Sequence, residues 1–571
     1  MPFPALSLTE AHRRLTAPGA PFEMVETEIR GQVLRVWKNA PPTLRDAFVL
    51  GRKHGDKTFL VYNDERASFE AFSRAAVTLA HELRRLGVVK GDRVAIAMRN
   101  LPEWPVAFFA AILAGAIATP LNAWGTGPEL EYGLTDSGAK IAIVDRERLE
   151  RLFEHLHNCH DLAQVIVSRE GEEIAHPLVA KLEVIIGETD SWAELPDLPL
   201  PDVDMESDDD ATIFYTSGTT GKPKGALGTH RNSCTTILAR PFGIARAYLR
   251  RGEPIPRPDP SAPQKATLLS VPFFHTTGCQ STMIPGFVAG LKLVMMRKWD
   301  AEAALKLIAR ERITSAGGVP TIVWQLIEHP HFGQHDLSSL EGFAYGGAPA
   351  PAELVRRIKS TLPRSFASTA WGMTETSAPF TVVVGEDYET HPASVGPALP
   401  VGDIRVVDAN SKDVPLGQSG ELWVRGPNVV KGYWRNPQAT EQTFGGGWLR
   451  TGDIGKLDAE GFCVIVDRAK DMLIRGGENI YCVEVENALY EHPAVIDAAV
   501  IGIPHHTLGE EPGALVTVKP GHAVDEAELR AFVAERIAAF KVPVRVILRD
   551  EMLPRNANGK ILKKELRGAF V

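Results

Sequence analysis

The chain has 571 residues, of which 44% are hydrophobic and 23% are charged, and its formal net charge at pH 7 is -9. The composition is typical of a globular protein, the length predicts at least two domains, and the acidic balance disfavours a nucleic acid as the main partner. No secretory signal pattern, no apolar run long enough to cross a bilayer and no paired cysteines stand out, so we expect a cytoplasmic protein that acts on small molecules.

Short apolar runs rich in β-branched residues alternate with helical segments in the first two thirds of the chain. The runs lie at 94–98, 140–144, 164–168, 212–217, 267–273 and 291–296. This alternation predicts buried, largely parallel strands in an α/β fold. A helix is expected over 301–312 with Asp300 as its N-cap. Residues 246–265 are rich in arginine and proline, which predicts a surface loop. Docking of this loop on a membrane surface remains an open alternative.

The pattern of expected strands, turns and helices changes twice in the last third of the sequence. From about residue 395 the expected strands become shorter and are separated by glycine, which predicts a β-rich subdomain over 395–467. After Asp467 a charged turn, a strand, a glycine turn and a helix follow one another. We therefore expect a large N-terminal domain over 1–467 and a small α+β domain over 468–571.

The stretch YTSGTTGKPKGALGTHRN, residues 215–232, has the residue types of a phosphate-binding turn. It is not a P-loop, because only two residues separate Gly218 from the pair Gly221-Lys222. A strand precedes it and a helix is expected from about Thr229, so backbone N–H groups could surround a phosphate. The other candidate ligands are the hydroxyls of Thr216, Ser217, Thr219 and Thr220 and the ammonium of Lys224. A flexible surface loop is the alternative interpretation.

Five further motifs follow this stretch: WGMTET at 371–376, LRTGD at 449–453, DRAKD at 467–471, RGGENIY at 475–481 and RNANGK at 555–560. In this order they resemble the adenylate-forming enzymes, which include acyl-CoA synthetases, luciferases and peptide-synthetase adenylation domains. The resemblance covers about residues 50 to 570. It implies a large domain of two packed α/β sheet subdomains plus the β-rich subdomain, and a small mobile α+β C-terminal domain.

The resemblance implies a two-step reaction. A carboxylic acid attacks the α-phosphate of ATP, pyrophosphate leaves, and the acyl group then passes from AMP to the thiol of CoA. The phosphate-binding turn would hold the β- and γ-phosphates, and Thr216 and Glu375 would support Mg²⁺, a cation that prefers oxygen ligands. The remaining implied nucleotide ligands are Gly346, Gly347, Ala348, Trp371, Gly372, Met373, Thr374, Asp453 and Arg468. Trp371 stands where tyrosine is commoner, which we expect to alter the stacking on adenine.

Lys560 is implied to be the catalytic lysine of the first step. Asn558-Gly559 predicts a turn that could present its ammonium, whereas the following Lys563, Lys564 and Arg567 read as a solvated helix face. Lys560 cannot take part in both steps. The resemblance therefore implies that the small domain rotates about Lys470 between them. Rotation would bring the loop containing Gly476 and Gly477 to the site for the second step.

Three members of the superfamily compete as the nearest type. His275-Thr276-Thr277 lacks the acidic residue by which peptide-synthetase domains bind an amine, and the motifs show no oxygen chemistry of a luciferase. A luciferase therefore stays a minor alternative. The GGENIY loop favours an acyl-CoA synthetase, and the resemblance implies that His275 is an aromatic gate beside an acyl pocket that includes Thr277, Val319 and Tyr345. Medium- to long-chain fatty acids and aryl acids both remain open, and we expect a homodimer. The alternatives are an adenylate-only enzyme and a catalytically idle acyl-binding protein on the same fold.

Overall fold

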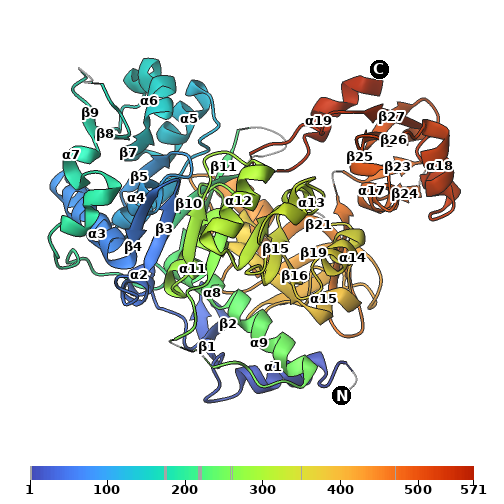
Figure 1. Ribbon diagram of the computed structural model, residues 1–571, viewed down its shortest axis with the longest axis horizontal. Coiled ribbons are helices and arrows are strands. Elements are labelled where there is room, and N and C mark those ends of the chain that lie inside the picture. Colours follow the sequence, from blue (N-terminus) through green and yellow to red (C-terminus); the bar gives the residue numbers. More distant parts are fainter. Residues whose placement is uncertain are drawn as a thin grey trace.

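The computed structural model describes residues 3–172, 176–216, 222–257, 259, 261–348, 350–469, 471–476, 478–557 and 559–570. A large body contains two eight-stranded sheets and a four-stranded sheet, and the carboxy-terminal residues form a five-stranded sheet of their own. Figure 1 shows this last part, in red, at one side of the large body. The predicted α/β fold class is confirmed.

The first eight-stranded sheet has the order β20-β11-β10-β6-β5-β7-β8-β9. Its strands are β5 (Arg93–Ala97), β6 (Ile117–Pro120), β7 (Ala139–Asp145), β8 (Gln164–Ser168), β9 (Val179–Lys181), β10 (Asp210–Thr216), β11 (Lys224–Thr229) and β20 (Gly432–Tyr433). The central strands β6, β5, β7 and β8 are parallel, and β11 pairs antiparallel with both β10 and β20. The expected strands at 94–98, 140–144 and 164–168 are thereby confirmed, as is the strand expected from residue 212 up to Thr216.

The second eight-stranded sheet has the order β17-β16-β15-β14-β12-β13-β3-β4. Its strands are β3 (Thr58–Tyr62), β4 (Glu65–Ser68), β12 (Ala266–Leu269), β13 (Lys292–Met295), β14 (Ser315–Gly318), β15 (Gly342–Gly346), β16 (Phe366–Met373) and β17 (Ala378–Val384). The strands β12, β14, β15 and β16 are parallel, so their carboxyl ends meet at one edge. This edge is where α/β sheets bind ligands.

One hydrophobic core joins the two sheets. Residues of α3 (Phe69–Arg85) and α4 (Glu103–Leu113) pack in it with residues of β5 from the first sheet and of β12 and β13 from the second. All of α4 is buried, and it ends just before Gly115, whose φ of +82° turns the chain. The two packed sheet subdomains are therefore one continuous body.

The expected helix over 301–312 is α12 (Ala301–Glu311). Asp300 caps it, since its carboxylate accepts a hydrogen bond of 2.7 Å from the backbone N–H of Ala303. Other helices of the large body are α1 (Leu8–Thr16), α2 (Leu44–Arg52), α5 (Gly127–Ser137), α6 (Arg146–Leu152), α7 (Glu183–Ile186), α8 (His230–Ile237), α10 (Thr276–Gly278), α11 (Ile284–Val288), α13 (Pro320–Ile327), α14 (Ala352–Thr361), α15 (Glu386–Thr390) and α16 (Pro437–Phe444).

The expectation of a surface loop from residue 246 is wrong for its first part. Helix α9 (Ala239–Arg251) runs through it, and Arg246 and Arg250 are almost completely buried. Arg250 lies 2.6 Å from the carboxylate of Asp387, a residue of α15 that the sequence gives no reason to place there. The arginine content of the segment suggested exposure to solvent, but Arg250 forms a buried ion pair instead.

The last third of the chain forms two smaller sheets. The β-rich part contains β18 (Asp403–Val407), β19 (Gly420–Arg425), β21 (Leu449–Leu457) and β22 (Cys463–Arg468). The carboxy-terminal part contains β23 (Leu473–Arg475), β24 (Glu478–Ile480), β25 (Val495–His505), β26 (Gly509–Val518) and β27 (Arg545–Arg549), with α17 (Cys482–Tyr490), α18 (Glu526–Ala534) and α19 (Lys563–Leu566). In the part of the chain that the structure describes, no helix has both the length and the apolar character needed to cross a membrane.

Candidate active site

A cavity of about 1550 Å³ lies where the carboxyl ends of the second sheet face the β-rich and carboxy-terminal parts. The predicted site residues that line it are Thr216, Lys224, His275, Gly346, Gly347, Ala348, Trp371, Gly372, Met373, Thr374, Glu375, Asp453, Arg468 and Lys560. Gly476 is not among the described residues of its lining. The predicted ligands Ser217, Gly218, Thr219, Thr220, Gly221, Lys470 and Gly477 lie outside the described residues.

The phosphate-binding turn joins two antiparallel strands, which corrects the expected strand–turn–helix. Thr216 at the end of β10 is in register with Lys224 at the start of β11, and its hydroxyl donates to the Lys224 carbonyl at 3.3 Å. Helix α8 does begin at His230 with Thr229 as its N-cap, as predicted. Because β11 separates this helix from the turn, the amino end of α8 is not part of the turn.

Glu375 follows β16 directly, in the short turn η5 (Thr374–Thr376). Its side chain is buried, and its carboxylate accepts a hydrogen bond of 2.7 Å from the hydroxyl of Tyr433. The same Tyr433 ring lies under the ammonium of Lys224, with 4.7 Å from Nζ to the ring centre. Burial raises the pKa of Glu375, and the Tyr433 hydrogen bond opposes that shift.

Tyr433 is a site residue that the sequence analysis missed. In KGYW it reads as one aromatic residue in a short strand. Only the pairing of β20 with β11, in which Tyr433 is opposite Ala226, brings it beside Glu375 and Lys224. The adjacent aromatic residues Tyr433 and Trp434 were the one feature of the sequence that could have drawn attention to this position.

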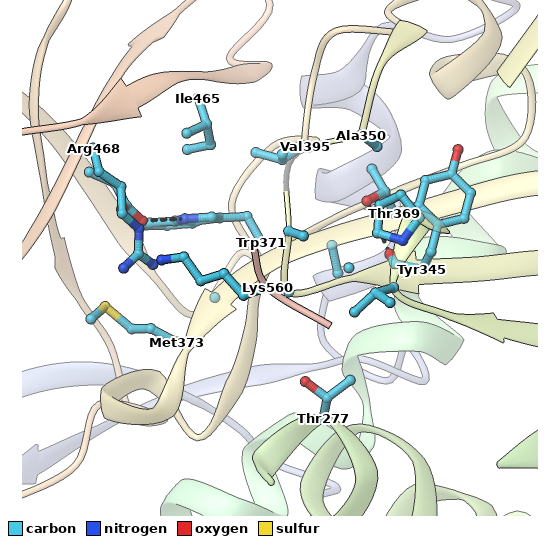
Figure 2. A pocket seen from close by; sticks show the side chains of 18 of the residues that line it. Thr277, Tyr345, Ala350, Thr369, Trp371, Met373, Val395, Ile465, Arg468 and Lys560 are labelled. Atoms are coloured by element: carbon cyan, nitrogen blue, oxygen red, sulfur yellow. Dashed lines mark hydrogen bonds and ion pairs between the residues drawn. The ribbon is translucent and has the colours of Figure 1, made fainter. Parts of the chain in front are cut away.

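The carboxylate of Asp453 is held by two donors, one from the neighbouring strand and one from the second eight-stranded sheet. The indole Nε1 of Trp371 donates to its Oδ2 at 2.8 Å, and Nε of Arg468 lies 3.1 Å from its Oδ1. Asp453 on β21 is directly opposite Arg468 on β22, and Asp453 and Trp371 are both buried. Figure 2 shows the Trp371 hydrogen bond at one side of the pocket. The aspartate is thereby fixed in orientation at the cavity wall.

Two glycines at the end of β15 allow the backbone to approach the cavity closely. A Cβ on Gly346 would lie 2.9 Å from the carbonyl oxygen of Ala370, and Gly347 has a φ of +76°. A side chain is therefore disfavoured at both positions, in agreement with a segment that lies against a ligand.

His275 lies at the N-cap of α10 and lines the cavity, as do Thr277, Val319 and Tyr345. Its Nδ1 accepts a hydrogen bond from the backbone N–H of Thr277 at 3.3 Å. Burial lowers the pKa of His275 to about 4, so the ring is neutral at pH 7. It presents an uncharged aromatic surface to the cavity.

Lys560 enters the cavity on a turn of the carboxy-terminal part. The Lys560 backbone N–H donates to Oδ1 of Asn556 at 3.0 Å, and Gly559 has the φ of +73° of a turn glycine. A Cβ on Gly559 would lie 2.6 Å from the Val319 side chain, so the turn rests against the large body. Figure 2 shows the Lys560 side chain in the pocket with Trp371, Met373 and Arg468.

The expectation that Lys563 belongs to a solvated helix face is wrong. Its ammonium lies 2.6 Å from the buried carboxylate of Glu486 on α17. This ion pair anchors the segment that follows Lys560 to the carboxy-terminal sheet. A basic run in the sequence therefore contains one structural lysine, which its neighbours did not reveal.

Comparisons with known proteins agree with this geometry. Residues 48–434 match the AMP-binding enzyme family, and residues 484–560 match the AMP-binding enzyme C-terminal domain. The chain belongs to this family. The expected membership of the adenylate-forming enzymes is confirmed.

Several similar proteins are CoA ligases. A feruloyl-CoA synthase of Amycolatopsis sp is 36% identical over 508 residues, which cover 88% of this chain and 94% of that protein. A long-chain-fatty-acid–CoA ligase of Bacillus subtilis (strain 168) is 33% identical over 533 residues, or 90% and 91% of the two chains. The crystal structure of the anthranilate CoA ligase AuaEII in complex with anthranoyl-AMP has a TM-score of 0.79 at 28% identity and covers 92% of this chain and 96% of that one.

These matches confirm the expected reaction class. The protein is an AMP-forming acid–thiol ligase, which uses ATP to activate a carboxylic acid and transfers the acyl group to CoA.

Proposed function

We propose that this ligase acts on a medium- to long-chain fatty acid or an aryl acid, with Lys560 as the catalytic residue of adenylate formation. One observation carries the proposal: Lys560, Glu375 and Asp453 line the same cavity although they come from three separate parts of the fold. The relatives, which include a feruloyl-CoA synthase and long-chain-fatty-acid–CoA ligases, support this range of acids.

The residues divide into groups that bind ATP from opposite sides. Lys224 and the turn before it would bind the β- and γ-phosphates, and Asp453 would accept hydrogen bonds from the ribose hydroxyls. The nucleotide base would lie between Trp371 and the glycines at 346 and 347. In this arrangement the ammonium of Lys560 stabilises the negative charge that gathers as the carboxylate approaches the α-phosphate.

Mg²⁺ fits the oxygen atoms that this site offers. The buried Glu375 carboxylate and the Thr216 hydroxyl both line the cavity, and hard oxygen ligands are those that Mg²⁺ prefers. When bound, the ion neutralises phosphate charge. Tyr433 holds the Glu375 carboxylate in place and favours its charged form.

The second half-reaction requires a different arrangement of the carboxy-terminal part. We place the domain boundary after Asp467 and the hinge at Lys470, so that residues 468–571 rotate as a small domain. Gly476 lies away from the cavity lining in the present arrangement, with its N–H donated to the Leu508 carbonyl at 2.8 Å. Rotation would withdraw Lys560 and bring Gly476 and Gly477 to the site, where they would admit the thiol arm of CoA.

We further expect a cytoplasmic homodimer. The described cysteines Cys159, Cys234, Cys279, Cys463 and Cys482 are all buried and free, which fits a reducing compartment. Size-exclusion chromatography with light scattering tests the dimer, and a monomer at working concentrations would contradict it.

Pyrophosphate release across a panel of fatty and aryl acids, with and without CoA, tests the proposed function. We expect release with a subset of acids, a single turnover without CoA and multiple turnovers with it. Multiple turnovers that do not depend on CoA would instead favour an adenylate-only enzyme. No release with any acid would favour an idle acyl-binding protein.

A further inference from the structure

Arg240 lines the same cavity as the reaction site and has no part in the chemistry described above. It lies in the first turn of α9, which packs tightly on β17: a Cβ on Gly243 would lie 2.7 Å from the Val382 side chain. Ala239 and Phe242 of the same helix are buried in the core. The helix therefore holds the Arg240 side chain at the cavity wall.

The guanidinium of Arg240 lacks a carboxylate partner. Its Nη2 donates to the Ser315 hydroxyl at 3.1 Å, and no ion pair within the described ranges of the chain includes it. The charge of Glu341 favours the protonated form of Arg240, but this carboxylate pairs with the ammonium of Lys265 at 2.6 Å. Loss of hydration lowers the pKa of Arg240.

Two buried arginines of the same helix, in contrast, have a carboxylate partner. Arg250 lies 2.6 Å from Asp387, and Arg246 lies 3.8 Å from the same carboxylate. A buried cation without a partner is rare in proteins because the loss of hydration is not offset. Among these three arginines, the one that faces the cavity is the one without an anion.

The position of Arg240 in the cavity corresponds to the far end of a bound acid. Its partner Ser315 begins β14, whereas Gly318 ends that strand next to Val319, which contacts the Lys560 turn. Three residue steps of roughly 3.3 Å separate Ser315 from Gly318, which gives a span of roughly 10 Å. Ser315, Gly317, Gly318 and Val319 all line the same cavity as Arg240 and Lys560. One cavity therefore extends along β14 from the Lys560 turn to Arg240.

Hydroxyl groups form part of the lining around Arg240. Thr267 on β12 is the register partner of Ser315 on β14, and both line the cavity, as do Thr236 of α8 and the apolar Ala239 and Val382. Hydroxyl groups of this kind suit a charged or hydrogen-bonding group better than the end of a hydrocarbon chain, which gains only from apolar contacts.

We propose that Arg240 binds a carboxylate at the far end of the substrate, so that the preferred acid is a dicarboxylic acid spanning the cavity from Lys560 to Arg240. The proposal rests on the proposed function and specifies its substrate. A guanidinium pairs with a carboxylate through two parallel hydrogen bonds, which supplies both affinity and orientation. The other carboxylate of the diacid then lies at the adenylation site, near Lys560.

Matched acids test the proposal without changing the protein. Octanedioate is compared with octanoate, and 4-carboxycinnamate with cinnamate, by the kcat/KM of pyrophosphate release. Since a hydrogen-bonded charge contact far from the reacting atoms acts on binding, we expect the diacid of at least one pair to be preferred about 10- to 100-fold, mainly through KM. Equal or better use of the monocarboxylic acid in both pairs would overturn the proposal.

Variants of Arg240 test the contact itself. R240M should remove the preference for the diacid while it keeps or improves the use of the monocarboxylic acid, and R240K should retain part of the preference. R251M is the control and should leave the preference unchanged, because Arg251 ends the same helix in ion pairs with Glu253 and Glu386 and is not among the residues that line the cavity.

Thermal unfolding distinguishes a substrate contact from a structural one. Because R240M removes a partly buried charge without an anionic partner, we expect its Tm to be equal to or above that of the wild type. A lower Tm together with equal losses on the diacid and the monocarboxylic acid would show a structural role and overturn the proposal. No pyrophosphate release with any acid would instead contradict the proposed function.

Discussion

The indole N–H of Trp371, on the second eight-stranded sheet, donates to the carboxylate of Asp453 on the four-stranded sheet at 2.8 Å. Arg468 contacts the other oxygen of the same carboxylate at 3.1 Å. Each carboxylate oxygen thus has one protein donor and keeps lone pairs for a ligand in the cavity. Trp371 is a positioning residue for Asp453, a role that adenine stacking alone would not require.

Substitution of Trp371 by phenylalanine tests this role. A phenyl ring stays, while the N–H donor and the second ring of the indole are lost, so we expect the KM for ATP to rise about 10-fold with a small change in kcat. W299F is a suitable control, because Trp299 donates to Gln325 at 2.6 Å and is not among the residues that line the cavity. An unchanged KM for ATP in W371F would show that the hydrogen bond does not orient Asp453.

Tyr433 should influence the requirement for Mg²⁺. Its hydroxyl lowers the pKa of the buried Glu375, so Y433F should raise that pKa further and disfavour the charged carboxylate. We expect the Mg²⁺ concentration for half-maximal activity to rise several-fold in Y433F, and the difference from the wild type to grow as the pH falls. Identical Mg²⁺ titrations at pH 6 and pH 8 would contradict the role of the hydrogen bond.

His275 should act as a neutral aromatic residue. Its pKa is lowered from 6.5 to about 4, so its contribution to stability is present above pH 6.5 and is lost as the pH falls toward about 4. We expect the unfolding free energy of H275F to depend less on pH across this window, and the kcat/KM for the acid to stay near the wild-type value at pH 7 to 8. A strong loss of activity in H275F at pH 8 would show that the imidazole takes part in proton transfer or hydrogen bonding.

The proposed hinge has a selective test. A proline at Lys470 restricts φ at that position and should impede rotation of residues 468–571. We expect K470P to slow the transfer of a supplied acyl-adenylate to CoA about 10-fold or more while adenylate formation changes little. Equal effects on both half-reactions would place the hinge elsewhere.

Local patterns in the sequence predicted the elements that depend on local interactions. The alternating apolar runs correspond to strands of both large sheets, and Asp300 caps α12 because its neighbours in sequence supply the N–H groups. Lys560 and Asp453 were found only through a resemblance, since each has an ordinary local explanation in a turn.

Contacts between distant segments were the ones missed. The sequence predicted that Arg250 and Lys563 are solvated. In the structure Arg250 pairs with Asp387 of α15, and Lys563 pairs with Glu486 of α17. Tyr433 reaches Glu375 only through the pairing of β20 with β11, and the unpartnered charge of Arg240 is visible only where α9 meets the cavity. Burial and pairing of charges follow from the fold as a whole and not from the composition of a segment.

Separate measurement of the two half-reactions in K560A tests the central claim most directly. Pyrophosphate release from ATP and the acid reports adenylate formation, and the transfer of a supplied acyl-adenylate to CoA reports the second step. We predict that K560A loses adenylate formation by about 100-fold or more, the usual effect of removing one charge-stabilising group, while thioester formation stays near the wild-type rate. Equal losses in both half-reactions would contradict the assignment of Lys560 to the first step.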